Sequence, residues 1–396
     1  MRKKLLAAII IAMGILTACG KEEVDSPIID VTPEPITKET EETAETEETA
    51  AETEETEEVS DELVLITNRE VVDGKMQSYL TGEWKDAEIA QRRNIAVMTP
   101  NNKPAMPLYG ISYASVIYEA PAEKESCTRL MALYEDYDDL DRIGPVRSSR
   151  DYYVYEAMAY DSVYVNWGLA VPYAGPLFDA KRIDHISQAV GGQSNAYSNA
   201  FDRFDRPGYS TEFTGYLLVD KVDDAIKAKG YETEYTDRFV QAFTFADAEE
   251  GSRAEYADYE DAVKIIPGAN ADGGGYEEAN SYFTYDEETK LYTRYQHGGV
   301  LKDESNGEAV TVTNVVIKIC YGEWRDDNGY LAFGVHGGGD AIVFTNGKVI
   351  KGTWQRNSDY EPNLFFDENG NEIIFNQGKT WICNVMDKYV NDITWE

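Results

Sequence analysis

The stretch Ile143–Gly168, IGPVRSSRDYYVYEAMAYDSVYVNWG, predicts a strand end, a tight turn, a helix and a second strand. The turn falls at Gly144-Pro145, a pair that sets the direction of the backbone. Ser148 is the expected N-cap of the helix, with Asp151 three residues later completing a weak capping box. Beyond Asp161 the side chains alternate with a period of two, as in a β-strand. This succession predicts an α/β layer in the first half of the chain.

The start of this helix carries the most distinctive chemistry. Arg147 and Arg150 flank two serines at the point where free backbone N–H groups and the positive end of the helix dipole converge. A cation in the first turn opposes that dipole by about 0.3–1 kcal/mol, so an anion is expected nearby. One interpretation is a protein carboxylate such as Asp151 or Glu119. The other is an anionic ligand.

Six residues at strand ends or at the helix start are expected to line one cleft, because ligands of such sheets bind beyond the carboxyl ends of the strands. They are Glu119, Arg129, Arg147, Ser148, Arg150 and Trp167. Arginine pairs of this kind suit phosphate or carboxylate groups, including those of peptidoglycan precursors or anionic wall polymers.

Three segments carry a resemblance to a known family: Val116–Pro121 (VIYEAP), Thr128–Leu133 (TRLMAL) and Ile143–Tyr153. They resemble the YerB-like bacterial lipoproteins, and the most specific motif is GPVRS-x-RD. The resemblance covers most of Arg93 to Met386. It implies an extracytoplasmic location and a two-part domain plan, without an assigned biochemical activity.

The chain departs from that family at two places. A glycine-rich loop before the family's Thr-Arg pair is replaced by Glu125-Ser126-Cys127. A Pro-His-Asn segment is replaced by Arg206-Pro207-Gly208-Tyr209, so no role of that histidine is carried over.

The first residues have the pattern of a lipoprotein signal. Arg2-Lys3-Lys4 is a charged n-region, and the apolar run Leu5–Leu16 is shorter than the about 20 residues that span a bilayer. Leu16-Thr17-Ala18-Cys19 resembles a lipobox, whose cysteine is diacylated, as by palmitate, and becomes the mature N-terminus. We expect a signal peptide at 1–18 and a lipid anchor at Cys19 that holds the chain on the extracytoplasmic face of the cell membrane. An ordinary secretory signal with a chance cysteine is the alternative.

Residues 19–62 are expected to form a disordered acidic tether. This segment holds 18 Asp and Glu residues against Lys21 and Lys38. It has too few apolar residues to offset the entropy of ordering. A binding role for the segment is the alternative to a solvated linker.

The charge of the chain excludes a generic nucleic-acid binder. The total is −37, and residues 63–396 keep −24 once the +3 of residues 1–18 and the −16 of residues 19–62 are set aside. Such a surface repels nucleic acid, so an anion site has to be local and lined by arginines.

The pattern predicts neither a cofactor nor a metal. The three histidines, His185, His297 and His336, stand outside the spacings of zinc sites. The sequence has no nucleophile elbow, Walker loop or Rossmann fingerprint.

From about residue 241 the chain changes to short β-type runs with turn signals such as Asn346-Gly347. We expect an α/β domain at 63–240 and a mostly antiparallel β domain at 241–396. Cys320 and Cys383 lie in expected strands of the second domain, as a disulfide or as buried free thiols.

These observations favour a non-enzymatic binding or regulatory factor of the cell envelope. Its partners would be the membrane, through the lipid anchor, and peptidoglycan, other anionic envelope material or an envelope enzyme. The alternative is a phosphate- or glycan-processing enzyme in which Glu119 or His185 transfers protons.

Overall fold

The computed structural model describes residues 63–188, 197–248, 251–270, 274–276 and 279–396. The expectations for the signal peptide, the lipidated Cys19 and the acidic tether lie outside these residues. Within the described part of the chain, no helix is both long and apolar enough to cross a membrane.

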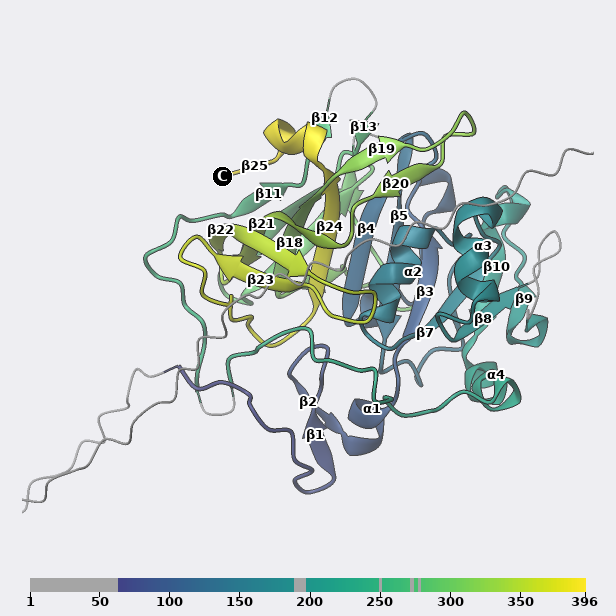
Figure 1. The fold of residues 1–396 in the computed structure, drawn as a ribbon, viewed down its shortest axis with the longest axis horizontal. Coiled ribbons are helices and arrows are strands. Elements are labelled where there is room, and N and C mark those ends of the chain that lie inside the picture. The colour runs from purple at the N-terminus through teal and green to yellow at the C-terminus, as the bar shows by residue number, and fades with distance from the viewer. Residues whose placement is uncertain (1–62, 189–196, 249–250, 271–273, 277–278) are drawn as a thin grey trace, which may run out of the picture. The chain divides into compact units, whose positions relative to one another are not determined.

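A mixed ten-stranded sheet forms the centre of the fold and takes strands from both halves of the chain (Figure 1). In spatial order its strands are β23 (Leu364–Asp367), β22 (Lys348–Arg356), β21 (Gly337–Thr345), β18 (Asn314–Cys320), β24 (Thr380–Met386), β4 (Val116–Ala122), β5 (Cys127–Tyr134), β3 (Ile95–Pro100), β7 (Val163–Trp167) and β8 (His185–Gln188). Strand β24 lies between β18 and β4 and runs parallel to both. The sheet therefore combines strands from both sides of residue 240, near which a domain boundary is expected.

A second sheet of six strands packs on part of this central sheet. It contains β16 (Gly299–Val300), β15 (Leu291–Gln296), β14 (Tyr282–Asp286), β11 (Lys264–Ile266) and β25 (Thr394–Trp395), with β17 (Thr311–Val312) paired to β15. The smaller sheets are β6 (Arg142–Ile143) with β10 (Gly215–Leu218) and β9 (Phe201–Arg203), β1 (Lys75–Gln77) with β2 (Trp84–Asp86), β12 (Ala269–Asn270) with β13 (Gly274–Gly275), and β19 (Gly322–Trp324) with β20 (Leu331–Phe333).

Four α-helices of the described residues accompany the sheets: α1 (Ala87–Gln91), α2 (Asp151–Met158), α3 (Val171–Asp179) and α4 (Val222–Lys229). The 3-10 helices that matter below are η4 (Thr211–Phe213) and η6 (Asp387–Asp392). Helix α4 ends at Gly230, whose φ of 70° is the left-handed conformation typical of a glycine C-cap.

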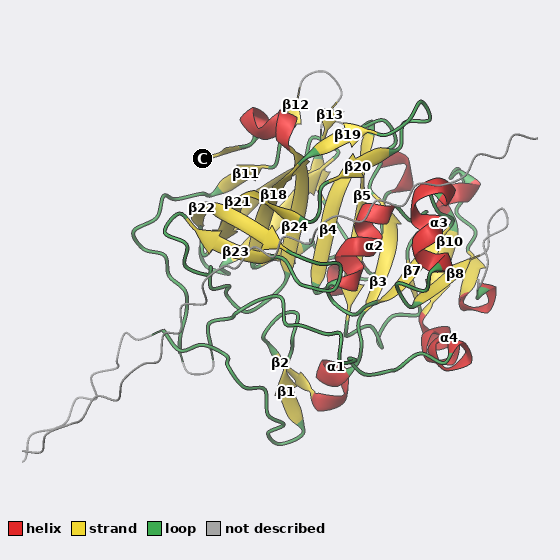
Figure 2. Ribbon diagram, viewed as in Figure 1, coloured by secondary structure: helices red, strands yellow, loops and turns green. Residues whose placement is uncertain are grey.

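The core has a layer on each face of the central sheet. Figure 2 shows helix α2 lying against the strands of this sheet. The face that carries Met98 and Met131 packs against α2, which is buried at seven of its eight positions. The opposite face packs against β14 and β15 through Phe283 and Tyr292. Strand β3 is buried along its whole length because both of its faces are covered.

The expected β character of the second half is confirmed, since its sheets are largely antiparallel. Asn346-Gly347 forms the turn between β21 and β22, as its sequence predicts. The α/β label fits the first half only loosely. Strand β5 is antiparallel to both of its neighbours, β4 and β3, so this half is a mixed sheet rather than a regular βαβ array.

The helix of the Ile143–Gly168 stretch forms, but its start differs from the expected one. Helix α2 begins at Asp151 with Arg150 at the N-cap and no side-chain cap bond. The capping box from Ser148 to Asp151 is therefore wrong. Ser149 donates its N–H to the Gly168 carbonyl (2.9 Å), so this part of the backbone is held beside the end of β7 and cannot begin a helix. The strand expected after Asp161 is confirmed as β7.

The segment 174–215 is more regular than its glycines and prolines suggest. It contains most of α3, together with β8 and β9 and the start of β10. Helix α3 tolerates Pro176 because buried Ala174, Leu177 and Phe178 anchor it to the core. Here tertiary packing overrides the local signal.

Cys320 and Cys383 are buried free thiols and form no disulfide. The two cysteines lie on neighbouring strands, where Cys383 pairs with Ile317 and Cys320 with Met386. Cys383 belongs to the core layer beneath the second sheet, and Cys320 to the layer on the α2 side. Their side chains therefore point to opposite faces of the sheet.

Candidate functional site

The arginines of the GPVRSSR segment lie where the parallel strands β3 and β7 end. Arg147 donates its N–H to the Met98 carbonyl (2.8 Å) and accepts the Trp167 N–H at its own carbonyl (3.0 Å). The segment is thus hydrogen-bonded between the two strand ends. Arg129 pairs with Pro100 in the ladder between β5 and β3, which brings it to the same edge of the sheet. The structure therefore brings Arg129, Arg147 and Arg150 together.

Two of these arginines share one carboxylate. Arg129 and Arg150 both donate to Oε1 of Glu123, at the tip of the β4–β5 hairpin. Arg129 also donates to the Ser148 carbonyl (2.6 Å), and Arg150 to the Ser149 carbonyl (2.9 Å). The two arginine side chains are nearly buried, whereas that of Glu123 is 38% exposed. A solvent-accessible carboxylate therefore occupies the meeting point of two buried guanidinium groups.

Arg147 has a different partner, Glu212 of η4. Its guanidinium lies 2.8 Å from the Glu212 carboxylate and 5.3 Å from the centre of the Phe213 ring. Its buried Nε has no hydrogen-bond partner among the described residues. Arg147 thus keeps a donor that a further acceptor could satisfy.

Positive charge prevails in this cluster. Burial lowers the pKa of Arg147 and of Arg150, and repulsion from Arg129 lowers both further. Arginine nevertheless stays protonated at neutral pH. Burial opposes ionisation of Glu123, but the charges of Arg129, Arg150 and Arg147 outweigh it and hold the pKa of that carboxyl below its usual value. The cluster therefore favours an anion at its centre.

The turn that carries Glu123 is conformationally strained. Glu123, Lys124 and Glu125 have φ values of 37°, 62° and 61°, in the left-handed region that non-glycine residues rarely adopt. Glu125 is held by Trp324 (2.6 Å), by Lys388 (2.7 Å) and by the Tyr389 hydroxyl (2.6 Å). Contacts from the C-terminal half thus fix the turn in place.

The hairpin of β19 and β20 adds a further wall. Arg325 donates to Asp151 at the start of α2 (2.8 Å), and the Arg150 guanidinium lies 5.3 Å from the centre of the Tyr330 ring. Lys124 donates its N–H to the Gly329 carbonyl (3.0 Å). Both halves of the chain therefore build the site.

Glu119 does not join this cluster, and the expectation that it lines the same cleft is corrected here. In the β4–β5 ladder Arg129 lies opposite Ala120, so Glu119 points to the other face of the sheet. There it is completely buried and forms an ion pair with Arg294 of β15 (2.8 Å). It also accepts hydrogen bonds from Asn101 (3.0 Å), Thr128 (2.7 Å) and Trp381 (3.0 Å). Its carboxylate links the two sheets.

The other expected site residues have structural contacts. Trp167 packs on Phe201, and its ring lies against the Cα of Gly215, where a Cβ would come within 2.4 Å of it. Ser148 donates its hydroxyl to the Trp167 carbonyl (3.2 Å). His185 lies at the opposite end of the β7–β8 pair from Trp167, buried against Phe178. Neither Glu119 nor His185 is in reach of the arginines.

Two carboxylates of the site, Glu123 and Glu212, escape sequence reasoning, as do Arg325 and Tyr330 from the second half of the chain. The two glutamates are single carboxylates in a chain with 73 Asp and Glu residues, so composition does not distinguish them. The one signal that could have found Glu123 is its position at the tip of the β4–β5 hairpin, six residues before Arg129. Among the described residues, no group of three or more His, Cys, Asp or Glu side chains is arranged to hold a metal ion.

Comparison with known proteins identifies the family. The models of the N-terminal and C-terminal domains of a protein of unknown function, DUF3048, match residues 80–232 and 274–382. The chain belongs to this family. It is 27% identical over 314 residues to "Putative lipoprotein YerB" of Bacillus subtilis (strain 168), covering 79% of this chain and 87% of that protein.

The fold of this chain is similar to that of a solved structure. The crystal structure of the YerB protein from Bacillus subtilis matches with a TM-score of 0.66 at 24% identity, over 81% of this chain and 99% of that one. At this level of identity the likeness concerns the fold.

Proposed function

We propose that this DUF3048 protein is a lipid-anchored factor on the extracytoplasmic face of the cell membrane that binds an anionic group of envelope material. The anchor is inferred from the lipobox at Cys19 and from the relative whose name describes a lipoprotein. The ligand group is a phosphate or carboxylate, as in peptidoglycan precursors or anionic wall polymers, and the contacting residues are Arg129, Arg147 and Arg150.

One observation carries the ligand proposal: two buried guanidinium groups, those of Arg129 and Arg150, share one carboxylate that is partly open to solvent, and the half-buried Arg147 lies beside them. Four arginines of the cluster face three carboxylates when Arg325, Asp151 and Glu212 are included. In a fold of charge −24, so local an excess of cations favours an external anion. Such an anion would accept from the free Nε of Arg147 and replace Glu123 as the partner of the other two arginines.

We infer a binding role rather than catalysis because the carboxylates beside the arginines, Glu123 and Glu212, are their ion-pair partners, and neither candidate proton-transfer group, Glu119 or His185, lies beside them. The Glu119 carboxylate is buried in an ion pair with Arg294, and His185 lies at the end of the β7–β8 pair opposite to Trp167. An enzymatic reading would need a proton-transfer group beside the bound anion.

The ligand proposal is tested by titration calorimetry of the detergent-solubilised lipoprotein with inorganic phosphate, soluble polyphosphate and isolated wall polymer. Arg147→Ala and Arg150→Ala should each weaken polyphosphate binding by about tenfold, since a charge-assisted hydrogen bond contributes about 1.5–3 kcal/mol. Glu123→Gln should tighten it, because the competing internal anion is removed.

The matched control for the arginine variants is Lys227→Ala, which removes an exposed cation on α4 outside the cluster. It should leave the affinity unchanged. Equal losses in Lys227→Ala and Arg147→Ala, or weaker binding in Glu123→Gln, would contradict the proposal.

The anchor is tested separately with Cys19→Ala. This variant should appear as unprocessed precursor or in the medium, whereas the wild type fractionates with the membrane. Membrane fractionation of Cys19→Ala as the processed form would refute a lipid anchor at this residue.

A further inference from the structure

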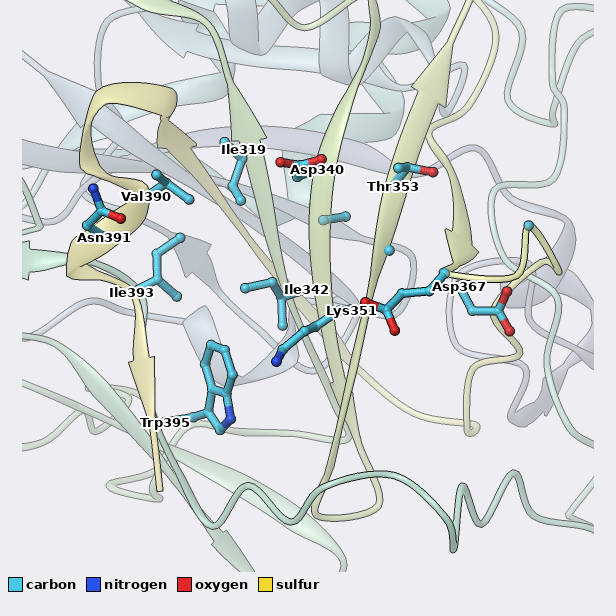
Figure 3. A pocket seen from close by; sticks show the side chains of 14 residues that line it. Ile319, Asp340, Ile342, Lys351, Thr353, Asp367, Val390, Asn391, Ile393 and Trp395 are labelled. Carbon is cyan, nitrogen blue, oxygen red and sulfur yellow. The ribbon is translucent and has the colours of Figure 1, made fainter.

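A groove lined by residues other than those of the arginine cluster lies on the C-terminal half of the central sheet (Figure 3). Its floor is one face of the neighbouring strands β18, β21 and β22, and its wall is formed by η6 and β25. The groove is open to solvent and has a volume of about 800 Å³, within the range of about 300–1,000 Å³ typical of ligand sites. The groove exists because the second sheet ends at β25, whereas the central sheet continues to β23.

The floor of the groove is apolar and continuous with the core. Ile319, Ile342 and Ile393 belong to the core layer beneath the second sheet, yet each keeps 7–9% of its surface exposed at this place. Val390 of η6 is 39% exposed, and Trp395 of β25 is only half-buried. A half-buried tryptophan beside an exposed valine and the edges of three isoleucines offers apolar surface to a partner.

The rim of the groove is acidic. Asp340 and Glu368 are exposed, and Asp367 is half-buried, with Asn369 and Asn371 bonded to it. Among the described residues that line the groove, the one cation is Lys351, which points toward Trp395, with its ammonium 5.0 Å from the ring centre (Figure 3). Three carboxylates against one ammonium leave a local charge of −2.

We propose that this groove binds a basic, extended segment of a partner protein that inserts apolar side chains onto the isoleucine floor. Charge complementarity identifies the occupant. The acidic rim repels anionic wall polymers, and it also repels residues 19–62 of this chain, which carry −16. A segment that alternates basic and aliphatic residues would place aliphatic side chains over Ile319 and Ile342 while its cations meet Asp340 and Glu368 at the rim.

This site shares no lining residue with the arginine cluster, although η6 borders both: Lys388 and Tyr389 hold Glu125, and Val390 lines the groove. The groove would bind a basic segment of a protein partner, whereas the cluster would bind anionic envelope material. Loss of one interaction should leave the other intact, because none of the residues that line the groove belongs to the cluster.

The experiment uses a fluorescent ten-residue peptide of alternating lysine and isoleucine, titrated with the detergent-solubilised lipoprotein. We expect saturable binding that weakens at least tenfold in the double variant Asp340→Lys, Glu368→Lys. Both side chains are exposed, so the fold should be retained, which thermal unfolding of the variant checks. Asp139→Lys is the control, because it changes an exposed carboxylate in the first half of the chain, and it should bind as the wild type does.

Two further peptides separate groove binding from general attraction to an acidic surface. With serine in place of isoleucine the peptide should lose most of its affinity, and with glutamate in place of lysine it should not bind. Equal affinity of the serine peptide would overturn the proposal, as would equal weakening by Asp139→Lys and by the double variant. Retained polyphosphate binding in the double variant would show that the groove and the cluster act separately, and its loss would overturn their independence.

Discussion

Glu119 and Glu123 stand four residues apart on one hairpin, and both are partners of arginine, yet their surroundings are opposite. Glu119 has no exposed surface and has four donors, from Asn101, Thr128, Arg294 and Trp381. Glu123 is 38% exposed and shares a single oxygen between two arginines. The first carboxylate holds two sheets together, whereas the second occupies a site that is open to solvent.

The difference shows how to separate structural from functional charge in this fold. The buried Glu119–Arg294 pair has no capacity for a ligand because it is closed to solvent, even though Nη1 of Arg294 lacks a hydrogen-bond partner among the described residues. A cluster with an excess of cations, a strained turn and an unsatisfied donor retains that capacity. Position in the sequence does not distinguish the two, because the same residue types occur in both.

The largest effect is expected from Glu119→Gln. This change leaves the buried Arg294 without a counter-charge, and we expect the free energy of unfolding to fall by about 3–5 kcal/mol. Glu123→Gln should cost less than about 1 kcal/mol, because its ion pairs are partly exposed. Urea denaturation of both variants measures the difference. A smaller loss in Glu119→Gln than in Glu123→Gln would invert the assignment of the two carboxylates.

A good part of this fold follows from sequence patterns. The apolar runs predict strands β3 and β7, and Gly230 marks the end of α4. The gathering of Arg129, Arg147 and Arg150 follows from the rule that strand ends and helix starts meet at one edge of a sheet. These features depend on residues close together in the chain.

The side of the sheet to which Glu119 points could not be predicted. It depends on the register of the β4–β5 hairpin, in which a shift of one residue would turn Glu119 toward the arginines. Its partner Arg294 lies 175 residues away, and no local pattern links the two. Glu212 and Tyr330 reach the cluster through equally long-range packing.

His185 provides a second comparison with Glu119. It is also buried, but the hydrogen-bond partner of its ring is the neutral Ser187 hydroxyl, at 2.7 Å. Burial lowers its pKa to about 4, and the charge of Lys229 adds to this shift, against the opposing effects of Asp184 and Asp179. In the unfolded chain the pKa is about 6.5. Between these values the unfolded state binds the extra proton, so stability should fall as the pH decreases from about 6.5 to about 4.

The expected slope is about 1.4 kcal/mol per pH unit across that window. Urea midpoints measured from pH 7 to pH 4 test it, together with the imidazole proton signals, which should show a neutral ring down to about pH 4. His185→Gln should remove this component of the slope. An imidazole that titrates near pH 6.5 in the folded protein would show that the ring is not buried as described.

The smallest effect is expected from the protonation of Glu123 at acid pH. Because the folded pKa of Glu123 lies below its unfolded value of about 4.3, its ion pairs stabilise the fold above that pH. This contribution is lost as the pH falls through the folded pKa, where the carboxyl becomes protonated.

The difference in unfolding free energy between the wild type and Glu123→Gln should therefore be below about 1 kcal/mol at pH 6 and vanish in acid. Urea midpoints at a series of pH values measure it, with Glu287→Gln as the control at an exposed carboxylate. If the stability of the wild type relative to Glu123→Gln instead rises as the pH falls, the ionised Glu123 carboxylate destabilises the fold. The arginines would then already be neutralised by other groups.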